Sequence, residues 1–173
     1  MNKQILSYTA GLFDGEGYVD IYSATKSKNS KSQNLMLRVV ISQKDGGIMN
    51  WLEDNFGGYV RMERRNDSWI YRWDIRSKMA EKFLILIEPF IKIKKEQVKI
   101  AIAFSKIKGN YLDTLKGSQG FRKLTKNELG ERNQLKRRLK QAKKTYIFYH
   151  KIVNIGTPTT TKRKDSQVGD VIV

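Results

Sequence analysis

The sequence predicts an α+β domain in which four antiparallel strands form one sheet and helices cover one of its faces. Three observations predict this fold class. Segments with helical spacing and segments with strand alternation follow one another along 173 residues, a length that suits one compact domain. The strands come in neighbouring pairs, and their short connections do not require a parallel crossover. In the second pair only Asn66 and Asp67 separate the strands, which is typical of a hairpin.

The first helix and the first pair of strands are predicted within residues 3–44. The apolar residues of KQILSYTAGLFD (3–14) have the spacing of three and four that places them on one helix face. YVDIYSATK (18–26) alternates as a strand does, and SKNSKSQN (27–34) has the polar composition of a turn or loop. LMLRVVISQK (35–44) is the clearest strand of the chain.

A second helix and a second pair of strands repeat this order. GGIMNWLEDNF (46–56) places its large apolar residues on one side of a short helix. GGYVRMERR (57–65) and SWIYRWDIR (68–76) are the two strands of the predicted hairpin. The last strand alternates apolar with charged residues, which indicates one buried face and one open face.

Helices are predicted over most of the remaining chain. SKMAEKFLILIEPF (77–90) is helical as far as its proline, and KIKKEQVKIAIAFSKIK (92–108) forms another helix. TKNELGERNQLKRRLKQAKKTYIFYHKI (125–152) forms a long one, followed by a polar, basic end that we expect to be extended or disordered. We therefore expect one domain over residues 1–153 and a basic C-terminal arm over residues 154–173.

The charge of the chain predicts a polyanionic partner. Its formal net charge is +17, and residues 122–164 alone hold 14 Lys and Arg against two Glu. A membrane surface is disfavoured because KNELGERNQLKRRLKQAKK lacks an apolar face beside its basic one, and no apolar run approaches the roughly 20 residues of a membrane span. Nucleic acid is therefore the favoured partner, and we expect no membrane partner. The absence of cysteine excludes disulfides and thiol catalysis.

The stretch TAGLFDGEG places acidic residues at the end of an apolar helix that is lined with small residues. Ser7, Gly11 and Gly15 recur every four residues and would let another helix approach closely. The simplest partner is the same helix of a second copy, across a twofold axis. The paired helix ends would then crowd Asp14 and Glu16 of both copies, and a divalent cation would relieve the repulsion. Oxygen ligands favour Mg²⁺, and a metal held against phosphate is typical of phosphodiester hydrolysis.

TAGLFDGEG resembles the signature motif of the LAGLIDADG homing endonucleases. The resemblance extends over nearly the whole chain, through Gln43-Lys44 at the end of the second strand, GGYVR (57–61) and PFIKIKKEQ (89–97). It implies the αββαββα LAGLIDADG homing-endonuclease fold, with a four-stranded antiparallel DNA-binding sheet and extra C-terminal helices. The single copy of the motif resembles the homodimeric branch of the family.

The resemblance also implies roles for individual residues. The catalytic residues would be Glu16, Gln43 and Lys94. Glu16 would bind the metal beside the Gly15 carbonyl, Gln43 would position the attacking water, and Lys94 would stabilise charge or organise solvent near the scissile phosphate. The dimer interface would include Ser7, Ala10, Gly11 and Asp14, with Asp14 capping the helix end near the twofold axis.

Two departures from the family pattern are visible. Glu16 stands where aspartate is commoner, and it is one methylene longer. A basic residue that often follows the glutamine by a few positions is missing, because Asp45 and two glycines follow Gln43-Lys44. Arg61 or Arg64 could replace it.

The open face of the sheet is expected to lie in the major groove of DNA. The expected contacts on this face are Tyr22, Lys26, Asn34, Arg38, Arg61, Arg72, Asp74 and Arg76. In the C-terminal arm, Lys162 and Arg163 are expected to contact backbone phosphates.

We therefore expect a site-specific double-strand DNA homing endonuclease that is intron-encoded and hydrolyses phosphodiester bonds with Mg²⁺ as a homodimer. Mn²⁺ would substitute, and Ca²⁺ would bind without supporting cleavage. The alternatives are an RNA-splicing maturase and a non-catalytic DNA-binding regulator on the same scaffold. The start of the chain lacks the features of a secretory signal, so we expect an intracellular, DNA-associated protein in a prokaryotic cytoplasm or an organelle.

Overall fold

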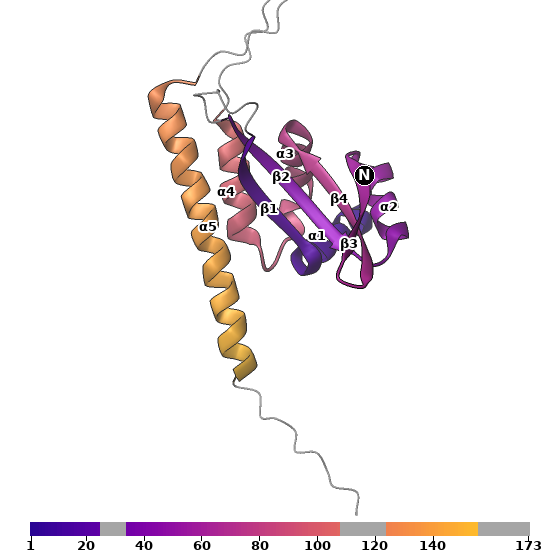
Figure 1. Ribbon diagram of the computed structural model, residues 1–173. Helices are drawn as coiled ribbons and strands as arrows, with labels where there is room; N and C mark the ends of the chain where they lie inside the picture. The colour runs from indigo at the N-terminus through magenta and orange to yellow at the C-terminus, as the bar shows by residue number, and fades with distance from the viewer. Residues whose placement is uncertain (25–33, 108–123, 156–173) are drawn as a thin grey trace, which may run out of the picture.

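The computed structural model describes residues 1–24, 34–107 and 124–155, with the backbone alone at 24, 34 and 146–155. Its elements confirm the predicted order and the predicted α+β class (Figure 1). They are α1 (Lys3–Glu16), β1 (Gly17–Ala24), β2 (Asn34–Gln43), α2 (Gly46–Phe56), β3 (Tyr59–Arg65), β4 (Ser68–Arg76), α3 (Ser77–Ile87), the 3₁₀ helix η1 (Glu88–Phe90), α4 (Lys95–Lys106) and α5 (Lys126–Ile155).

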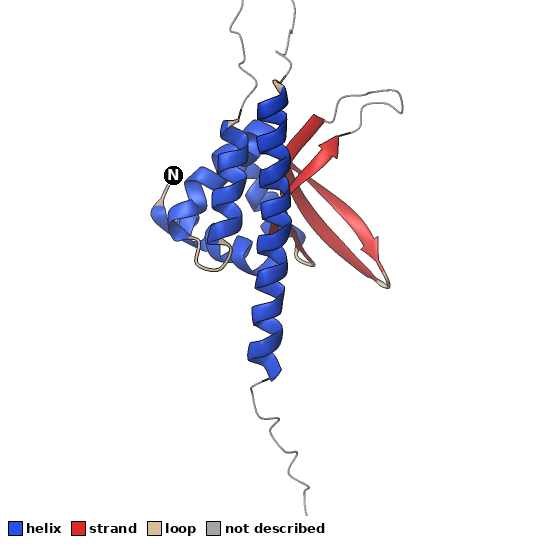
Figure 2. Cartoon of the chain, turned by 90° about the vertical axis from the view of Figure 1, so that its left-hand side faces the viewer, coloured by secondary structure: helices blue, strands red, loops and turns tan. Residues whose placement is uncertain are grey.

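The four strands form one antiparallel sheet in the order β1-β2-β4-β3. Figure 2 shows the helices gathered on one side of this sheet, which leaves the other side open. The register places Gly17 opposite Ile41 and Ile41 opposite Trp73. Asn66, in the turn between β3 and β4, has φ of +53°, as a two-residue hairpin turn requires.

The core lies between the sheet and the helices, and aromatic rings join its two layers. Trp73 of β4 is fully buried, and its ring centroid lies 5.0 Å from that of Phe83 in α3. The Phe83 ring also meets Phe56 of α2 at 5.1 Å and Phe13 of α1 at 6.3 Å. These edge-to-face contacts hold α1 against the rest of the core. They therefore position the C-terminal end of α1 relative to the sheet.

The helix α5 runs alongside α4 and the β1 edge of the sheet and then extends beyond both (Figure 1). Arg132 of α5 donates a hydrogen bond to the Leu35 carbonyl at 2.6 Å, and its guanidinium lies 4.3 Å from the centre of the Phe104 ring. Within the three described ranges, every helix is too short or too polar to cross a membrane.

Several helix ends differ from the sequence-based expectation by two or three residues: α3 ends at Ile87 instead of at 90, α4 at Lys106 instead of at 108, and α5 at Ile155 instead of at 152. Two further differences concern the site. The helix α1 continues to Glu16 instead of ending at Asp14, and α4 begins at Lys95 instead of at residue 92. Both differences have one cause, which is a set of hydrogen bonds between the end of α1 and residues 92–94.

Candidate functional site

The carboxylate of Asp14 is buried and holds the segment that precedes α4. It accepts hydrogen bonds from the backbone N–H groups of Lys92 at 2.8 Å, Ile93 at 3.1 Å and Lys94 at 2.9 Å. Asp14 therefore caps a segment that is about 80 positions away in the sequence, and not the end of its own helix.

The side-chain ammonium of Lys94 in turn contacts the end of α1. It is buried, and its Nζ donates to the carbonyl oxygens of Phe13 at 3.0 Å, Asp14 at 2.6 Å and Gly17 at 2.7 Å. Burial lowers the pKa of Lys94, and the carboxylates of Asp14 and Glu16 oppose this effect. The three carbonyls match the three N–H donors of the ammonium. The Phe13 carbonyl also accepts from the Gly17 N–H, and Gly17 already belongs to β1, so Lys94 ties the last turn of α1 to the start of β1.

Glu16 is the last residue of α1 and its side chain is exposed. Because Gly17 lies opposite Ile41, Gln43 ends β2 two residues beyond this pair, at the same end of the sheet. The alternation of β2 places Gln43 on the helix-covered face with Ile41. Glu16, Gln43, Lys94 and the Gly15 backbone therefore all lie at the end of α1 or at the adjoining end of the sheet, and their roles stay predictions.

The oxygen donors at this end of α1 suit a hard cation. Glu16 presents an exposed carboxylate, and the Gly15 carbonyl is not one of the three that Lys94 occupies. Among the described residues, three or more acidic, histidine or cysteine side chains nowhere come close enough together to hold a metal ion. A multi-carboxylate site would therefore need a second copy or residues outside this set.

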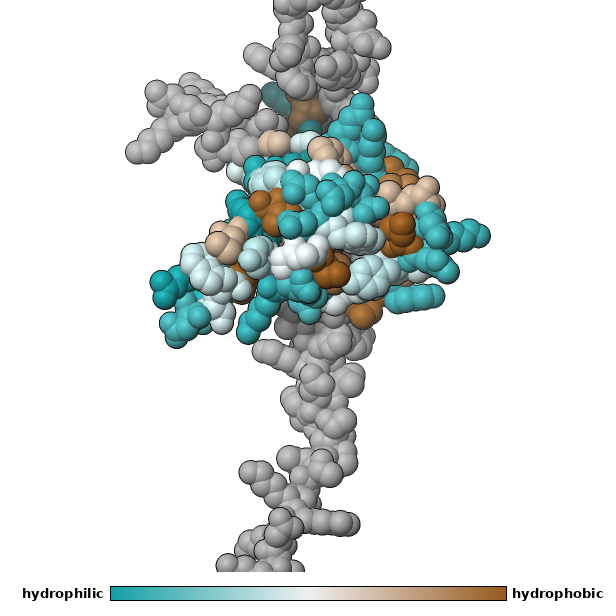
Figure 3. All heavy atoms as spheres, turned by 90° about the vertical axis from the view of Figure 1, so that its right-hand side faces the viewer, coloured by the Kyte–Doolittle hydropathy of each residue, from teal (hydrophilic) through white to brown (hydrophobic). Residues whose placement is uncertain are grey.

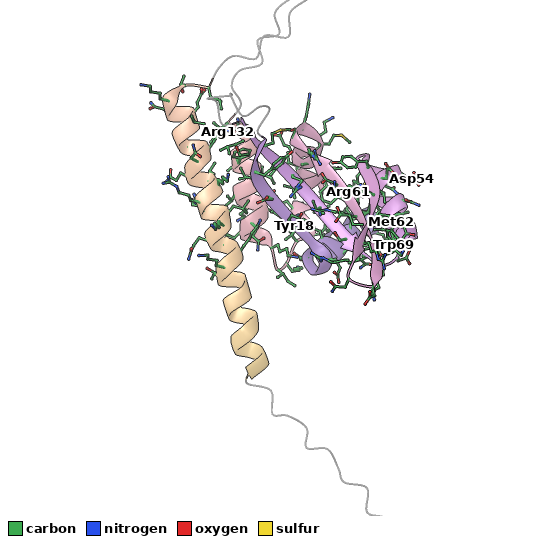
Figure 4. The ribbon with its side chains drawn as sticks, in the orientation of Figure 1. Tyr18, Asp54, Arg61, Met62, Trp69 and Arg132 are labelled. Carbon is green, nitrogen blue, oxygen red and sulfur yellow. The ribbon has the colours of Figure 1, made fainter. Side chains whose placement is uncertain are left out.

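On the open face of the sheet, Tyr18 connects several basic groups. Its hydroxyl accepts hydrogen bonds from Arg38, at 3.4 Å, and from Arg72. The guanidinium of Arg38 also lies 5.1 Å from the centre of the Tyr22 ring. Tyr18 is labelled in Figure 4, on the strand that lies nearest α5. The Nζ of Lys143 in α5 lies 5.8 Å from the centre of the Tyr18 ring. Sequence reasoning missed Tyr18, although the alternation of β1 places it on the same face as Tyr22.

Asp74 lies at the centre of this face and is completely buried. Arg76 donates to its two carboxylate oxygens at 3.0 and 3.3 Å, while Arg61 and Arg38 approach it at 3.6 and 3.9 Å. The hydrogen bonds from Arg76 and the charge of Asp74 raise the pKa of Arg76. Asp74 is therefore covered by the arginines, and an approaching ligand would meet the arginines first.

Some of the remaining predicted site residues lie on the open face, and others lie outside the described residues. Arg38, Arg61, Arg72, Arg76 and Tyr22 lie on the open face. Asn34 begins β2, but its side chain, like Lys26, Lys162 and Arg163, lies outside the described residues. Of the two expected replacements for the missing basic residue, Arg61 lies on the open face, whereas Arg64 lies on the helix-covered face, which is also the face of Gln43.

Two of the four residues expected at the dimer surface are buried within their own chain. Ala10 is 0% exposed and packs in the core of its own chain, so it cannot contribute area to an interface with a second copy. Asp14 is buried as well, by the hydrogen bonds described above. Ser7 and Gly11 are exposed, and open space surrounds the positions of a side chain at Gly11 and at Gly15.

On one side of the molecule, the exposed apolar residues that the structure describes do not form one large surface. Figure 3 views the side of the molecule on which α2 and the β3–β4 hairpin lie, and hydrophobic residues appear there as separate patches among hydrophilic ones. Met62 and Trp69 of the hairpin are about half exposed.

The fold and the site define a class of α+β domain in which the first helix ends in an exposed carboxylate beside an arginine-lined sheet. The family model of the LAGLIDADG endonucleases matches residues 9–111, which is more than half of the chain. The chain therefore belongs to the LAGLIDADG endonuclease family, a family of DNA endonucleases. This confirms the resemblance seen in the sequence.

Solved structures of homing endonucleases share the fold. I-CvuI in complex with its target in the presence of Ca is 15% identical, with a TM-score of 0.62 over 80% of this chain and 82% of that one. The archaeal intron-encoded I-Vdi141I, complexed with DNA, is 16% identical, with a TM-score of 0.59 over 80% and 84%. I-SmaMI bound to an uncleaved DNA target with calcium ions is 18% identical, with a TM-score of 0.57 over 79% of this chain but 44% of that one. No curated protein sequence matches the chain.

Proposed function

We propose that this protein is a site-specific endonuclease that cuts both strands of a DNA duplex, using Mg²⁺ and acting as a homodimer. The observation that carries the proposal is the exposed carboxylate of Glu16, which the Lys94 cap holds at the end of α1 beside the sheet. A domain with one such carboxylate and one basic face can bind one half of a target and serve one scissile bond.

The open face of the sheet is proposed to lie in the major groove. Arg38, Arg61, Arg72 and Arg76 come from three neighbouring strands, so their guanidinium groups form a broad basic surface. Arginine can bind a guanine edge through two hydrogen bonds, and the neighbouring tyrosine rings can contact thymine methyl groups. The expected additional contacts of Lys26, Asn34, Lys162 and Arg163 remain part of this proposal.

Two copies are proposed to meet along α1. Its exposed surface contains Ser7 and the two glycines, around which a partner backbone has room to approach. The chain matches more than four fifths of I-CvuI but less than half of I-SmaMI, which supports a protein that supplies one unit of a two-unit site. The twofold axis would bring the Glu16 carboxylates of both copies toward the duplex.

The proposed metal ligands are the Glu16 carboxylate and the Gly15 carbonyl. They fit Mg²⁺ because both are hard oxygen donors, and because Lys94 leaves the Gly15 carbonyl out of its cap. When bound, the cation would supply Lewis-acid activation for phosphodiester hydrolysis. Mn²⁺ is proposed as a substitute and Ca²⁺ as a ligand that permits binding without cleavage.

The other residues of the site are proposed to orient the reaction. Gln43 would position the attacking water from the end of β2. Lys94 would act as a positioning residue, because its three donors already bind the carbonyls that shape the end of α1. We further propose an intron-encoded protein that acts on DNA inside the cell.

The test is a cleavage selection with purified protein, its Glu16→Gln variant and a Glu53→Gln control in α2. Each is incubated with a library of random duplexes in Mg²⁺, in Ca²⁺ and in EDTA. We expect wild type and Glu53→Gln to cut a defined sequence in Mg²⁺ alone, and Glu16→Gln to bind the same sequence without cutting it. Binding without cutting by all three would indicate a regulator, and a preference for structured RNA would indicate a maturase. Full cleavage by Glu16→Gln would refute the metal assignment.

A further inference from the structure

We propose that Asp74 is a positioning residue that fixes the directions of Arg38, Arg61 and Arg76 and thereby sets the base selectivity of the sheet. The proposal depends on the proposed DNA-binding function of the open face. It differs from the sequence-based expectation, in which Asp74 was itself a DNA contact.

The carboxylate lies where arginines from three strands converge. Arg38 is on β2, Arg61 on β3 and Arg76 on β4, and the register places Asp74 between Val40 and Tyr59. The closest contacts are the two hydrogen bonds from Arg76, at 3.0 and 3.3 Å. At 0% exposure, Asp74 is reached by these guanidinium groups and not by solvent. A base or phosphate would have to displace an arginine to contact it.

A buried acid on a DNA-binding face needs a physical reason, because its charge repels phosphate. Its effect here is to restrict three flexible side chains before the duplex arrives. Reading a guanine through two hydrogen bonds requires a guanidinium plane of fixed direction, and an arginine that is already oriented loses less conformational entropy on binding. The carboxylate therefore lowers the attraction for any polyanion while raising the discrimination between sequences.

Two other acids on this face, Glu63 and Asp20, are more exposed to solvent than Asp74 is. Glu63 pairs with Arg61 at 2.9 Å and with Arg72 at 3.4 Å, and Asp20 approaches Arg38 at 4.0 Å. Their side chains are 45% and 36% exposed, so water competes for these contacts. Of these three acids, Asp74 is the one that is removed from water and meets arginines from three strands.

The experiment compares wild type, Asp74→Asn and the control Asp54→Asn, which removes an equal charge from an exposed position on α2. Binding is measured in Ca²⁺, without cleavage, to the target that wild type selects and to a scrambled duplex at the same salt concentration. We expect Asp74→Asn to bind the scrambled duplex as tightly as wild type or more tightly. Its ratio of target to scrambled affinity should fall by about tenfold. Asp54→Asn should keep the wild-type ratio.

A scan of single base pairs separates positioning from a general structural effect. Asp74→Asn should lose discrimination at the base pairs that Arg38→Ala and Arg61→Ala identify, and keep it elsewhere. A ratio within twofold of wild type, or an equal loss at every base pair, would overturn the proposal. If Asp74→Asn does not fold by circular dichroism, Asp74→Glu decides, since it keeps the charge but moves the carboxylate by one methylene. The same selective loss is expected for it, and an unchanged ratio overturns the proposal.

Failure of the two proposals can be distinguished. If wild type selects no duplex, the proposed function fails and this inference fails with it. If wild type selects a target and the Asp74 variants select it equally well, only the positioning role is wrong.

Discussion

The substitution Asp14→Asn tests how the end of α1 is held. In the wild type, one carboxylate oxygen accepts from the N–H groups of Lys92 and Ile93, and the other accepts from Lys94. Asparagine has nearly the same shape but replaces one oxygen with an NH₂ group. If its oxygen keeps the first two hydrogen bonds, the NH₂ group faces the Lys94 N–H, where a donor opposes a donor.

The expected cost follows from these contacts. A hydrogen bond to a charged group contributes about 1.5–3 kcal/mol, and a buried N–H without an acceptor costs about 1–3 kcal/mol. The two remaining hydrogen bonds weaken because their acceptor is now neutral. We expect the free energy of unfolding to fall by about 3 kcal/mol, which lowers the melting temperature by about 6–12 °C in a protein of this size.

The assay is urea unfolding followed by tryptophan fluorescence, since Trp73 is fully buried and reports on the core. Asp54→Asn is the matched control, because it makes the same chemical change at an exposed position and should stay within about 0.5 kcal/mol of wild type. The reasoning would be refuted if Asp14→Asn also stayed within that range. At urea concentrations below its unfolding transition, Asp14→Asn should still cleave DNA more slowly than wild type. The reason is that the carboxylate of Asp14 no longer holds Lys94 against the end of α1, where Glu16 lies.

Three further predictions concern the glycines and the C-terminal arm. Gly17→Ala should destabilise the fold by about 1–3 kcal/mol in thermal melts, since an added Cβ would lie 2.4 Å from the Phe13 ring and 2.8 Å from its carbonyl oxygen; an unchanged melting temperature would contradict this. Gly11→Leu should leave the monomer folded, because its Cβ position is open, but should abolish dimers in sedimentation; a dimer that persists rejects the packing along α1. Removing residues 156–173 should reduce the slope of log affinity against log salt by about two to three units if Lys162, Arg163 and Lys164 bind phosphates. An unchanged slope means that these residues do not bind phosphates.

The sequence by itself determined the element order, the layer arrangement and the face on which several candidate site residues lie. Alternation along β4 assigns Arg72 and Arg76 to one face and Trp73 to the other, because successive side chains of a strand point in opposite directions. The motif at the end of the first helix singled out Glu16 from the sequence alone, and its metal-binding role stays a prediction.

Only the tertiary structure decided how the first helix ends. It also decided which side chains of that helix are exposed to solvent. Lys94 meets the carbonyls of residues 13, 14 and 17 across about 80 positions of sequence, and no local periodicity carries that information. Ala10 shows the same limit, because the small residues of α1 look alike in sequence and only packing buries this one in the core. Local patterns fix which face of an element is apolar, whereas the partners of a buried charge depend on how distant elements pack.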